Sequence, residues 1–353
     1  MQNPALIFLK PPNGEPIPGQ DLAVLDRPIP DPSTLPPNHL SLQTLYSSLD
    51  PYLRNRMREP TRQSYAASLT PNTPIANFSV ARVLQSAHPT YTTDDLVYGI
   101  LPIQRFTTLD PSTTPAFKKL DPALTRDIPL VNMLGALGMP GLTAYSSLFE
   151  IGRPQRGEVL FVSSAAGAVG QIVIQLAKHA GLYVIGSVGT DAKLKYILSE
   201  LGCDAGFNYK TESVYEAIPR LLAAAGNKTG LDVYYDNVGG EQLDCALQWM
   251  NTYGRIVACG AISDYNAKTV GERFAQRNLV NVVGKQLTIR GFIVSGRDMG
   301  PKWEGERDRV VAEWLRDGSL VVKYHEDDVE AADKAFVGML RGENFGKAVL
   351  KVS

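Results

Sequence analysis

Apolar residues in the middle of the chain alternate between short β-type runs and helical segments. Residues 159–162 (VLFV) are an uncharged, β-favouring run typical of a strand buried on both faces. Small residues follow this run, and the apolar positions beyond them have the spacing of one helix face: Val169, Ile172, Val173 and Leu176. The pattern predicts a strand, a tight turn and a helix.

The same alternation continues through the next part of the sequence, where strand-like runs are separated by segments with helical periodicity. Six strands are predicted, at residues 159–162, 183–188, 205–207, 231–235, 255–259 and 287–294. Strands that alternate with helices favour a mostly parallel sheet with helices on both faces. We therefore predict an α/β, doubly wound Rossmann sheet.

The two ends of the chain have a different character. Residues 1–133 are rich in proline and in short β-type runs, and residues 321–353 return to strand and short helix. We expect the C-terminal part to pack on the N-terminal domain. The predicted organisation is a mainly β substrate domain formed by residues 1–133 and 321–353, and a dinucleotide-binding domain of residues 134–320.

The turn after the first predicted Rossmann strand suggests a phosphate site. Ala165, Gly167 and Gly170 occupy the three small-residue positions of a G-x-G-x-x-G fingerprint, with alanine in the first position. Free N–H groups in the first turn of the following helix would favour a pyrophosphate. An ordinary surface loop uses the same residues, but the strand before the turn and the helix after it favour a dinucleotide.

The end of the second predicted strand bears on the choice between NADH and NADPH. An NAD site usually has an acidic residue there, which binds the ribose 2′-hydroxyl. Asp191 lies beyond the strand, where Thr190 or Asp191 can cap a helix. Lys193 could attract a 2′-phosphate, although a solvated lysine on a helix would look the same. The sequence favours NADPH.

Composition restricts the partners and the cellular compartment. The 353-residue chain has a formal net charge of −1, which provides no overall field for nucleic acid or an anionic membrane. We expect small-molecule partners. The three cysteines are widely spaced, and the N-terminus lacks the features of a targeting signal. Both observations favour a cytoplasmic protein.

The first domain lacks the residues that a catalytic zinc ion requires. Residues 1–133 contain no cysteine, and the two histidines in this range, His39 and His88, lie in a strand-like run and before a proline. Three scattered cysteines also cannot form a four-cysteine structural zinc lobe. We expect no metal site.

Two polar residues near the ends of later strands are candidates for the chemistry. Tyr265 follows the fifth strand, so a hydroxyl donor is expected at the carboxyl end of the sheet, where it could bind the oxygen of a developing enolate. Asn237 follows the fourth strand and could contact a ribose or a carboxamide. Tyr265 could instead be a packed loop residue, and Asn237 could cap the helix that begins near Gly240.

Motifs spread over most of the chain carry a resemblance to a known family. They are SLDPYLR (48–54), GMPGLTAY (138–145), AAGAVGQ (165–171), FNYKT (207–211), YYDNVGGE (234–241), GRIVACGAISDYN (254–266) and GENFGKAV (342–349). The chain resembles the medium-chain dehydrogenase/reductase superfamily. Within it, the chain resembles the zinc-independent branch of leukotriene B4 12-hydroxydehydrogenase/prostaglandin reductase and the alkenal double-bond reductases. This resemblance implies a GroES-like substrate domain.

The resemblance also implies roles for individual residues. Tyr265 matches the active-site tyrosine of the family, and Tyr52 in the DPY motif would line the substrate site. The implied contacts to NADPH run in order from the phosphates to the nicotinamide: Gly167, Ala168, Val169 and Gly170 at the pyrophosphate, Lys193 and Tyr209 at the 2′-phosphate, and Asn237, Cys259, Gly260, Ala261, Ile262, Ser263 and Asn344 toward the nicotinamide.

Members of this branch reduce the C=C bond of α,β-unsaturated carbonyl compounds with NADPH, and they commonly form homodimers through an edge of the Rossmann sheet. The resemblance thus implies an ene reductase, with the strand at residues 287–294 as the candidate dimer edge. Alcohol oxidation, quinone reduction and cofactor binding without catalysis remain alternatives.

The chain departs from the family pattern at residues 75–79, near residues 104–106 and in the proline-free segment 266–286. All three positions are expected to border the substrate site. The departures leave the substrate open, and they suit a biosynthetic reductase in secondary metabolism as well as a detoxifying one.

Overall fold

The alternating apolar runs form a parallel sheet of six strands in the computed structural model, which describes residues 2–226 and 228–353. The strand order is β11-β10-β9-β12-β13-β14, the 3-2-1-4-5-6 order of a Rossmann sheet. The strands are β9 (Val159–Val162), β10 (Tyr183–Val188), β11 (Ala205–Asn208), β12 (Leu231–Asp236), β13 (Met250–Ala258) and β14 (Thr288–Gly291).

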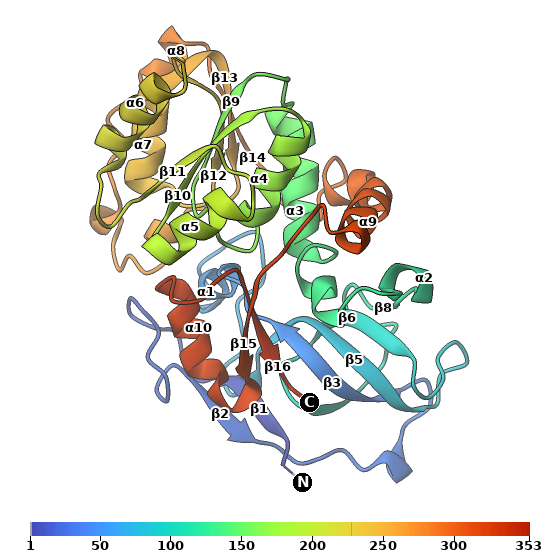
Figure 1. Cartoon of the computed structure of the whole chain (residues 1–353). Coiled ribbons are helices and arrows are strands. Elements are labelled where there is room, and N and C mark those ends of the chain that lie inside the picture. The colour runs from blue at the N-terminus through green and yellow to red at the C-terminus, as the bar shows by residue number, and fades with distance from the viewer. Residues whose placement is uncertain (1, 227) are drawn as a thin grey trace. The chain divides into compact units, whose positions relative to one another are not determined.

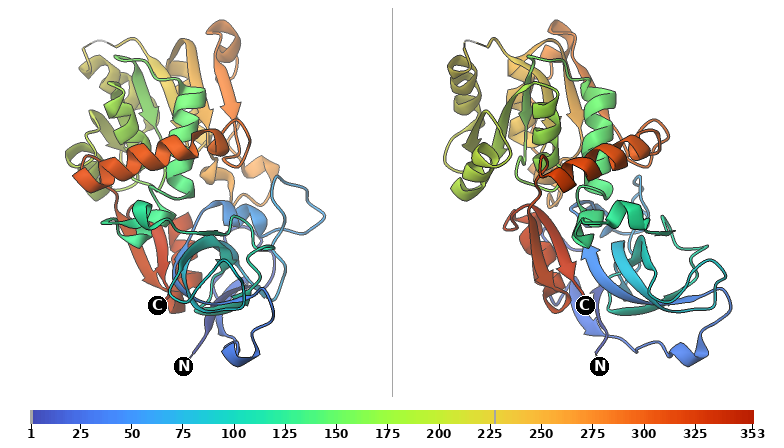
Figure 2. Two further views of the ribbon diagram at one scale, coloured as in Figure 1. Left: turned by 90° about the vertical axis from the view of Figure 1, so that its right-hand side faces the viewer. Right: turned by 45° about the vertical axis from the view of Figure 1, so that its right-hand side comes forward.

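Helices cover both faces of this sheet, as Figures 1 and 2 show. They are α3 (Met139–Ser147), which continues as the π-helix η3 (Leu148–Gly152), then α4 (Gly170–His179), α5 (Asp191–Ser199), α6 (Val214–Ala224), α7 (Gly240–Trp249), α8 (Asn281–Gly284) and α9 (Gly300–Asp317), with 3-10 turns η4 (Ile262–Asp264) and η5 (Val270–Glu272). The predicted doubly wound α/β fold is confirmed.

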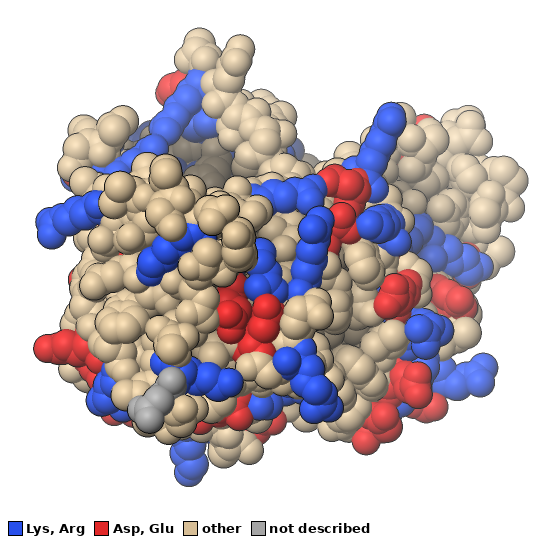
Figure 3. Space-filling view, turned by 90° about the horizontal axis from the view of Figure 1, so that it is seen from above, with Lys and Arg blue, Asp and Glu red and all other residues tan. Residues whose placement is uncertain are grey.

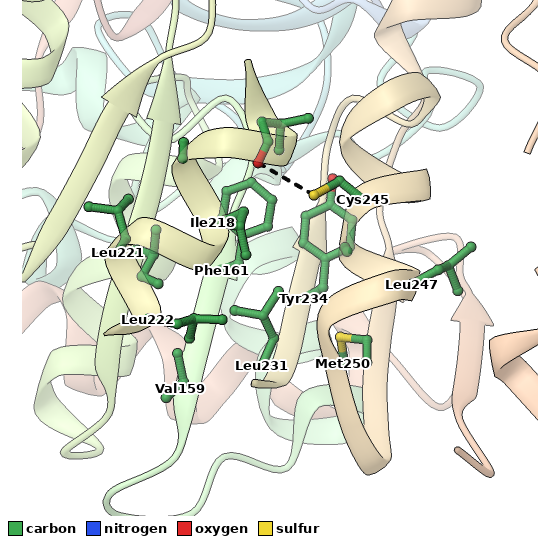
Figure 4. Packing of buried hydrophobic residues seen from close by; sticks show 14 of the residues in the cluster. Val159, Phe161, Ile218, Leu221, Leu222, Leu231, Tyr234, Cys245, Leu247 and Met250 are labelled. Atoms are coloured by element: carbon green, nitrogen blue, oxygen red, sulfur yellow. Dashed lines mark hydrogen bonds between the residues drawn. The ribbon is translucent and has the colours of Figure 1, made fainter. Parts of the chain in front are cut away.

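The face of the sheet under α6 and α7 has a continuous apolar core (Figure 4). Phe161 on β9 stacks on Tyr234 of β12, with ring centroids 4.9 Å apart. Leu221 and Leu222 of α6 and Cys245 of α7 belong to the same buried cluster. Each Å² of apolar surface buried in this core contributes about 25 cal/mol of stabilisation, which holds the helices on the sheet. The strand ends, and the loops that follow them, are thereby held in fixed positions.

The chain divides into two compact units, residues 135–323 around the parallel sheet and residues 1–134 with 324–353 around antiparallel strands. The sequence-based division at residues 133 and 320 lies close to these bounds. A buried cluster joins both chain ends within the second of these units, since Leu6 and Phe8 pack with Val329 and Phe336. In Figure 1 the red C-terminal segment correspondingly lies beside the blue N-terminal strands.

The antiparallel unit contains a seven-stranded sheet and a three-stranded sheet. The larger sheet has the order β15-β16-β3-β5-β6-β8 with β7 paired to β3, and the smaller one has the order β2-β1-β4. The strands are β1 (Pro4–Phe8), β2 (Leu22–Asp26), β3 (Leu40–Ser48), β4 (Thr73–Pro74), β5 (Ala76–Ser86), β6 (Leu96–Pro102), β7 (Phe106–Leu109), β8 (Lys118–Lys119), β15 (Tyr324–Asp328) and β16 (Lys347–Lys351). The helical elements are η1 (Pro32–Thr34), α1 (Tyr52–Arg56), α2 (Pro122–Thr125), η2 (Leu130–Leu134), η6 (Val329–Ala331) and α10 (Ala332–Leu340).

Acidic and basic side chains are intermixed on the face of the molecule seen from above (Figure 3), in keeping with the formal net charge of −1. Among the described residues, no helix combines the length and the apolar character needed to cross a membrane.

Candidate active site

The glycine-rich turn between β9 and α4 leaves no room for side chains at two positions. A Cβ atom at Gly170 would lie 2.3 Å from the carbonyl oxygen of Ser164, and one at Gly167 would lie 2.9 Å from the Ser164 hydroxyl. Contacts below 3.0 Å require the structure to shift. Ser164 itself has a left-handed backbone with φ of 51°. The turn therefore has a single tight shape that depends on both glycines.

This turn presents backbone donors at the beginning of a helix. The amides of Ala165 and Gly167 donate to Ser187 O and Ser164 O. The amides of Ala168 and Val169, which immediately precede α4, donate no hydrogen bond to any acceptor in the described part of the chain. Free N–H groups at the start of a helix are suited to bind a phosphate. The residues predicted for the pyrophosphate thus fit such a group.

The loops after β10 and β11 bring two lysines and a tyrosine together. The Tyr209 ring lies against Gly189, where a Cβ atom would be 2.8 Å from the tyrosine hydroxyl oxygen. Burial lowers the pKa of Lys193, and the positive charge of Lys210 lowers it further. Two cations near one another favour an anionic ligand. Lys210 was not among the residues predicted from the sequence, and only its position directly after Tyr209 could have indicated it.

The acidic residue near this loop does not point to an NAD site. Thr190 is the N-cap of α5, and its hydroxyl accepts a hydrogen bond from the Lys193 amide at 3.2 Å. Asp191 is the first residue of the helix and accepts from Asn208 Nδ2 at 2.8 Å. The capping role considered for either residue belongs to Thr190. Asp191 is engaged by Asn208 instead.

The strand order of the sheet reverses between β9 and β12, and hydrogen bonds of Asn237 join the ends of these two strands. Its Nδ2 donates to Ser163 O at 2.8 Å and its backbone amide donates to Ser163 Oγ at 2.9 Å. Gly239, not Asn237, is the N-cap of α7. The suggested capping role of Asn237 is therefore wrong. Its side chain instead joins the ends of the two strands at the place where ligands bind in doubly wound sheets.

Asp236 organises the loop after β12 and was missed by the sequence reasoning. This buried carboxylate accepts hydrogen bonds from the Tyr234 hydroxyl at 2.8 Å and the Gly239 amide at 2.7 Å. Burial raises its pKa, and the Gly239 amide acts in the opposite direction. Gly239 and Gly240 have φ of 70° and 54°, a conformation that favours glycine. The sequence DNVGG carried this signal, as an acceptor followed by two glycines.

The segment after β13 is held against the loop after β12. The amides of Cys259 and Gly260 donate to Asp236 O at 2.9 and 3.0 Å, and Ser263 Oγ donates to Val238 O at 2.7 Å. Ala261 packs against Gly239, where a Cβ atom would be 3.1 Å from the alanine side chain. These contacts connect the loop after β12 to the segment after β13 at the carboxyl end of the parallel sheet.

Tyr265 lies at the end of this segment, directly after the 3-10 turn Ile262–Asp264. Its hydroxyl oxygen would be 3.3 Å from a Cβ atom built on Gly260, so the ring folds back over the loop. The side chain is partly buried. A phenol in this position at the carboxyl edge of the sheet is suited to donate a hydrogen bond to a ligand oxygen.

The predicted residues therefore fall into two groups. The structure brings one group together on loops that follow the carboxyl ends of β9, β10, β11, β12 and β13: Gly167, Ala168, Val169, Gly170, Lys193, Tyr209, Asn237, Cys259, Gly260, Ala261, Ile262, Ser263 and Tyr265. Tyr52 and Asn344 belong to the antiparallel unit. Tyr52 begins α1 and donates to Asn77 Oδ1, and Asn344 Nδ2 donates to Gly346 O at 2.7 Å within its own turn.

Comparisons with known proteins identify the family. Residues 168–306 match the family described as zinc-binding dehydrogenase, and residues 5–116 match the N-terminal domain of oxidoreductase. The chain is 45% identical over 353 residues to NADP-dependent oxidoreductase RED1 of Cochliobolus heterostrophus, covering 100% of this chain and 98% of that protein. The chain belongs to the medium-chain dehydrogenase/reductases.

Two further relatives place this dehydrogenase/reductase within the superfamily. It is 39% identical to the 2-alkenal reductase (NADP(+)-dependent) of Nicotiana tabacum, over 90% of this chain and 88% of that one. The crystal structure of CurA in complex with NADPH from Vibrio vulnificus matches with a TM-score of 0.87 and 30% identity over 99% of both chains. The predicted branch, an oxidoreductase with NADPH or NADP+ as cofactor, is confirmed.

Within residues 2–226 and 228–353, no group of three or more His, Cys, Asp or Glu side chains is arranged to hold a metal ion.

Proposed function

We propose that this dehydrogenase/reductase uses NADPH to reduce the C=C bond of an α,β-unsaturated carbonyl compound. The observation that carries the proposal is the position of Tyr265, whose hydroxyl lies over Gly260 at the sheet edge with the predicted cofactor residues. The similarity to a 2-alkenal reductase supports the same substrate class.

In the proposed reaction, bound NADPH would supply the hydride that adds to the β-carbon and would itself be oxidised to NADP+. The Tyr265 hydroxyl donates a hydrogen bond to the carbonyl oxygen as that atom gains negative charge. A proton then adds to the α-carbon, so that one hydride and one proton are added across the C=C bond. Stabilisation of the enolate oxygen is the step assigned to this chain.

The remaining roles follow the chemistry of each loop. The turn Gly167–Gly170 would bind the pyrophosphate, and Lys193, Lys210 and Tyr209 the 2′-phosphate. Asn237 and the segment 259–263 would hold the nicotinamide half, and the family resemblance assigns Asn344 to the same half of the cofactor. Tyr52 would contact the substrate.

The test is incubation of the purified protein with NADPH and a panel of enals, enones, enoyl esters and quinones. Secondary alcohols are incubated separately with NADP+. The proposal expects NADPH oxidation together with the saturated carbonyl product. Reduction of only the carbonyl group or only quinones would assign a different reaction. Tight NADPH binding without any turnover would indicate a cofactor-binding protein and would contradict the proposal.

Tyr265→Phe is the matched test of the catalytic residue. Removing one acid or one enolate hydrogen-bond donor should lower turnover by roughly ten- to ten-thousandfold. Tyr253→Phe is the control, because Tyr253 lies in the same unit with 66% of its surface exposed. Equal activity of both variants would remove Tyr265 from the mechanism.

We further propose that the protein forms a homodimer through β14, the edge strand of the parallel sheet. An edge strand has unpaired backbone groups that can pair with a second copy. Exposed apolar residues accompany it: Ile289 and Ile293 are 41% and 45% exposed, and Val280, the N-cap of α8, and Val283 within α8 are 74% and 80% exposed. Exposed apolar residues beside a free edge favour burial against a like surface.

The oligomeric state of Ile289→Lys and Val283→Lys, measured by sedimentation or light scattering, tests this interface. We expect both variants to shift toward the monomer. Leu198→Lys on α5 is the control, since Leu198 is 40% exposed and lies at a distance from β14 in the strand order. A monomeric wild-type protein, or a dimer unaffected by both changes, would contradict the proposal.

We also propose a cytoplasmic location, because Cys203, Cys245 and Cys259 are all unpaired thiols in the structure. Cell fractionation with an antibody to the native chain tests it, and recovery in a membrane or organelle fraction would contradict it.

A further inference from the structure

A side-chain hydrogen bond ties together the two helices that begin at the proposed phosphate contacts. Helix α4 begins at Gly170 of the glycine-rich turn, and α5 carries Lys193 in its first turn. The Tyr196 hydroxyl of α5 donates to Gln171 Oε1 of α4 at 2.9 Å. Gln171 directly follows Gly170, and Tyr196 lies about one helical turn after Lys193. The bond therefore joins the two helices close to the groups proposed for the pyrophosphate and the 2′-phosphate.

The direction of this bond follows from the backbone of Lys323. Gln171 Oε1 accepts from the Lys323 amide at 3.0 Å, and Gln171 Nε2 donates to Lys323 O at 3.2 Å. The reversed amide would place two donors against each other and two acceptors against each other. The Gln171 oxygen is therefore fixed toward Tyr196. Because an amide oxygen can only accept, the Tyr196 hydroxyl must donate.

A second glutamine, one turn further along α4, repeats this arrangement. Gln175 Oε1 accepts from the Val321 amide at 2.8 Å, and its Nε2 donates to Val321 O at 2.8 Å. Four residues of helix rise about 6 Å, close to the roughly 6.6 Å that two residues of extended chain cover. The two glutamines thus match alternate residues of the segment 321–323. This match holds the Gln171 side chain in one orientation.

Lys323 also contacts the other partner of the bond. Its Nζ lies 4.2 Å from the centroid of the Tyr196 ring and 2.7 Å from Oε1 of Glu200, the C-cap of α5. Burial raises the pKa of Tyr196, the negative charge of Glu200 raises it further, and the Lys323 amide acts in the opposite direction. The buried phenol keeps its proton and remains a donor to Gln171.

Apolar packing alone does not set where α5 lies along the sheet. Ile197 of α5 packs on β10, where a Cβ atom at Gly186 would lie 2.7 Å from Ile197 Cδ1. This contact brings the helix close to the sheet, but apolar attraction has no direction. A hydrogen bond depends on both distance and angle. The bond from Tyr196 therefore adds a lateral restraint that the apolar contact lacks.

This restraint acts toward α4, whereas another one acts toward the opposite side. Asn208, at the end of β11, donates to Asp191 of α5. In the strand order, β11 and β9, which leads into α4, lie on opposite sides of β10. Figure 1 shows α4 and α5 on the same face of the sheet. The bond between Tyr196 and Gln171 thus relates the position of α5 to that of α4.

The pyrophosphate and the 2′-phosphate belong to one ligand and are joined through the adenosine ribose, so the groups that bind them need a matching separation. We infer that Gln171 and Tyr196 are positioning residues for the 2′-phosphate. Their bond sets the separation between the turn Gly167–Gly170 and Lys193, and thereby contributes to the preference for NADPH over NADH. This inference rests on the cofactor contacts given under the proposed function.

The test is calorimetric titration of NADP+ and NAD+, which bind without turnover. Tyr196→Phe keeps the ring beside Lys323, and Gln171 Oε1 keeps the Lys323 amide as its donor, so no buried acceptor loses its last partner. We expect the affinity for NADP+ to fall by about two- to tenfold, the value of one hydrogen bond, while the affinity for NAD+ stays level. A general loss of structure would weaken both cofactors alike.

Double variants show whether the effect passes through Lys193. In a Lys193→Ala background, Tyr196→Phe should leave the affinity for NADP+ unchanged, because the positioned cation is absent. Gln171→Met should also weaken NADP+, and Tyr196→Phe should add nothing to that loss, since both changes break the same bond.

Tyr215→Phe is the matched control in the same unit. The Tyr215 hydroxyl on α6 donates to Asp244 Oδ2 at 2.6 Å, and that oxygen keeps Asn278 Nδ2 as a donor at 2.8 Å. The control removes one tyrosine hydrogen bond away from α4 and α5. We expect it to keep the wild-type affinities for NADP+ and NAD+.

Four results would overturn the inference. They are wild-type NADP+ affinity in Tyr196→Phe, an equal loss for NADP+ and NAD+, the same loss in the Lys193→Ala background, and an equal loss in Tyr215→Phe. If Lys193→Ala itself leaves the affinity for NADP+ unchanged, the proposed phosphate contact fails as well. An effect of Lys193→Ala without any effect of Tyr196→Phe contradicts only this inference.

Discussion

The hydroxyl oxygen of Tyr265 lies over Gly260, so close that a Cβ atom on the glycine would be 3.3 Å from it. The same Cβ atom would be 3.2 Å from the carbonyl oxygen of Asn237. The glycine has no left-handed backbone requirement, and its small size alone admits the tyrosine. Gly260 thus determines where the proposed hydrogen-bond donor stands.

Gly260→Ala should therefore lower turnover more than it lowers stability. Its methyl group would push the Tyr265 hydroxyl by a few tenths of an ångström, and displacements up to about 1 Å can cost on the order of a hundredfold in rate. We expect kcat with a 2-alkenal to fall at least about threefold while the thermal midpoint changes little.

Gly305→Ala is the control for that change, because a Cβ atom at Gly305 meets nothing within 4 Å and alanine favours the helix α9. Wild-type turnover in Gly260→Ala would show that Tyr265 tolerates displacement or has no role.

The affinity for NADPH should depend on pH through Lys193. The charged lysine would attract the 2′-phosphate. Burial lowers the pKa of Lys193 from the ordinary lysine value, and the positive charge of Lys210 lowers it further. As pH rises toward this lowered pKa, the protein loses the cation and the KM for NADPH increases. The increase begins at lower pH than an ordinary lysine would give. The KM for NADH, which has no 2′-phosphate, should stay level over the same range.

Lys193→Ala should raise the KM for NADPH by about ten- to a hundredfold, the range for a lost hydrogen bond to a charged group, and remove its pH dependence. Lys195→Ala on the exposed side of α5 is the matched control. Equal effects of Lys193→Ala on NADPH and NADH would contradict the phosphate role.

Local sequence signals were sufficient for most of the parallel sheet. The predicted strands at 159–162 and 183–188 have the bounds of β9 and β10, because a buried parallel strand is a short apolar run between turn residues. The strand expected at 287–294 is shorter, since β14 spans only Thr288–Gly291. As an edge strand it pairs on one side only, and the apolar run does not define where pairing ends.

The start of α9 and the contact of Asn77 could not be predicted for different reasons. A helix was expected at 307–316, but α9 spans Gly300–Asp317, because Pro301 and two glycines hide a first turn in which proline is tolerated. Asn77 appeared only as a departure from a family pattern. Its partner Tyr52 is 25 residues away and on another element, so the contact depends on how β5 and α1 pack.

All three cysteines should react slowly in the folded protein. Burial raises the pKa of Cys203, Cys245 and Cys259 to about 12 in each case. The thiolate is the reactive form, so at pH 8 its population should be about a thousandfold lower than for a free cysteine with pKa near 8.5. Labelling with a thiol reagent should be slow in buffer and fast in denaturant. Rapid labelling of Cys259, the most exposed of the three, would contradict this prediction.

The buried pair Lys347 and Asp50 should contribute to stability mainly as a unit. Lys347→Met removes the cation and leaves the buried Asp50 carboxylate without a counter-charge. It also leaves Leu49 O without its lysine donor, whereas Ala348 O keeps the Leu49 amide as a donor. Breaking a buried pair in this way costs about 3–5 kcal/mol. We therefore expect a loss of that size in the free energy of unfolding measured with denaturant.

The double variant Lys347→Met with Asp50→Asn distinguishes the pair from its separate contacts. If the two charges stabilise each other, the double variant should lose less than the sum of the two single losses, by about 1–3 kcal/mol. Lys351→Met is the matched control, since Lys351 is exposed at the end of the same strand β16. Strictly additive losses, or a Lys347→Met variant as stable as Lys351→Met, would show that the Asp50 carboxylate does not need Lys347.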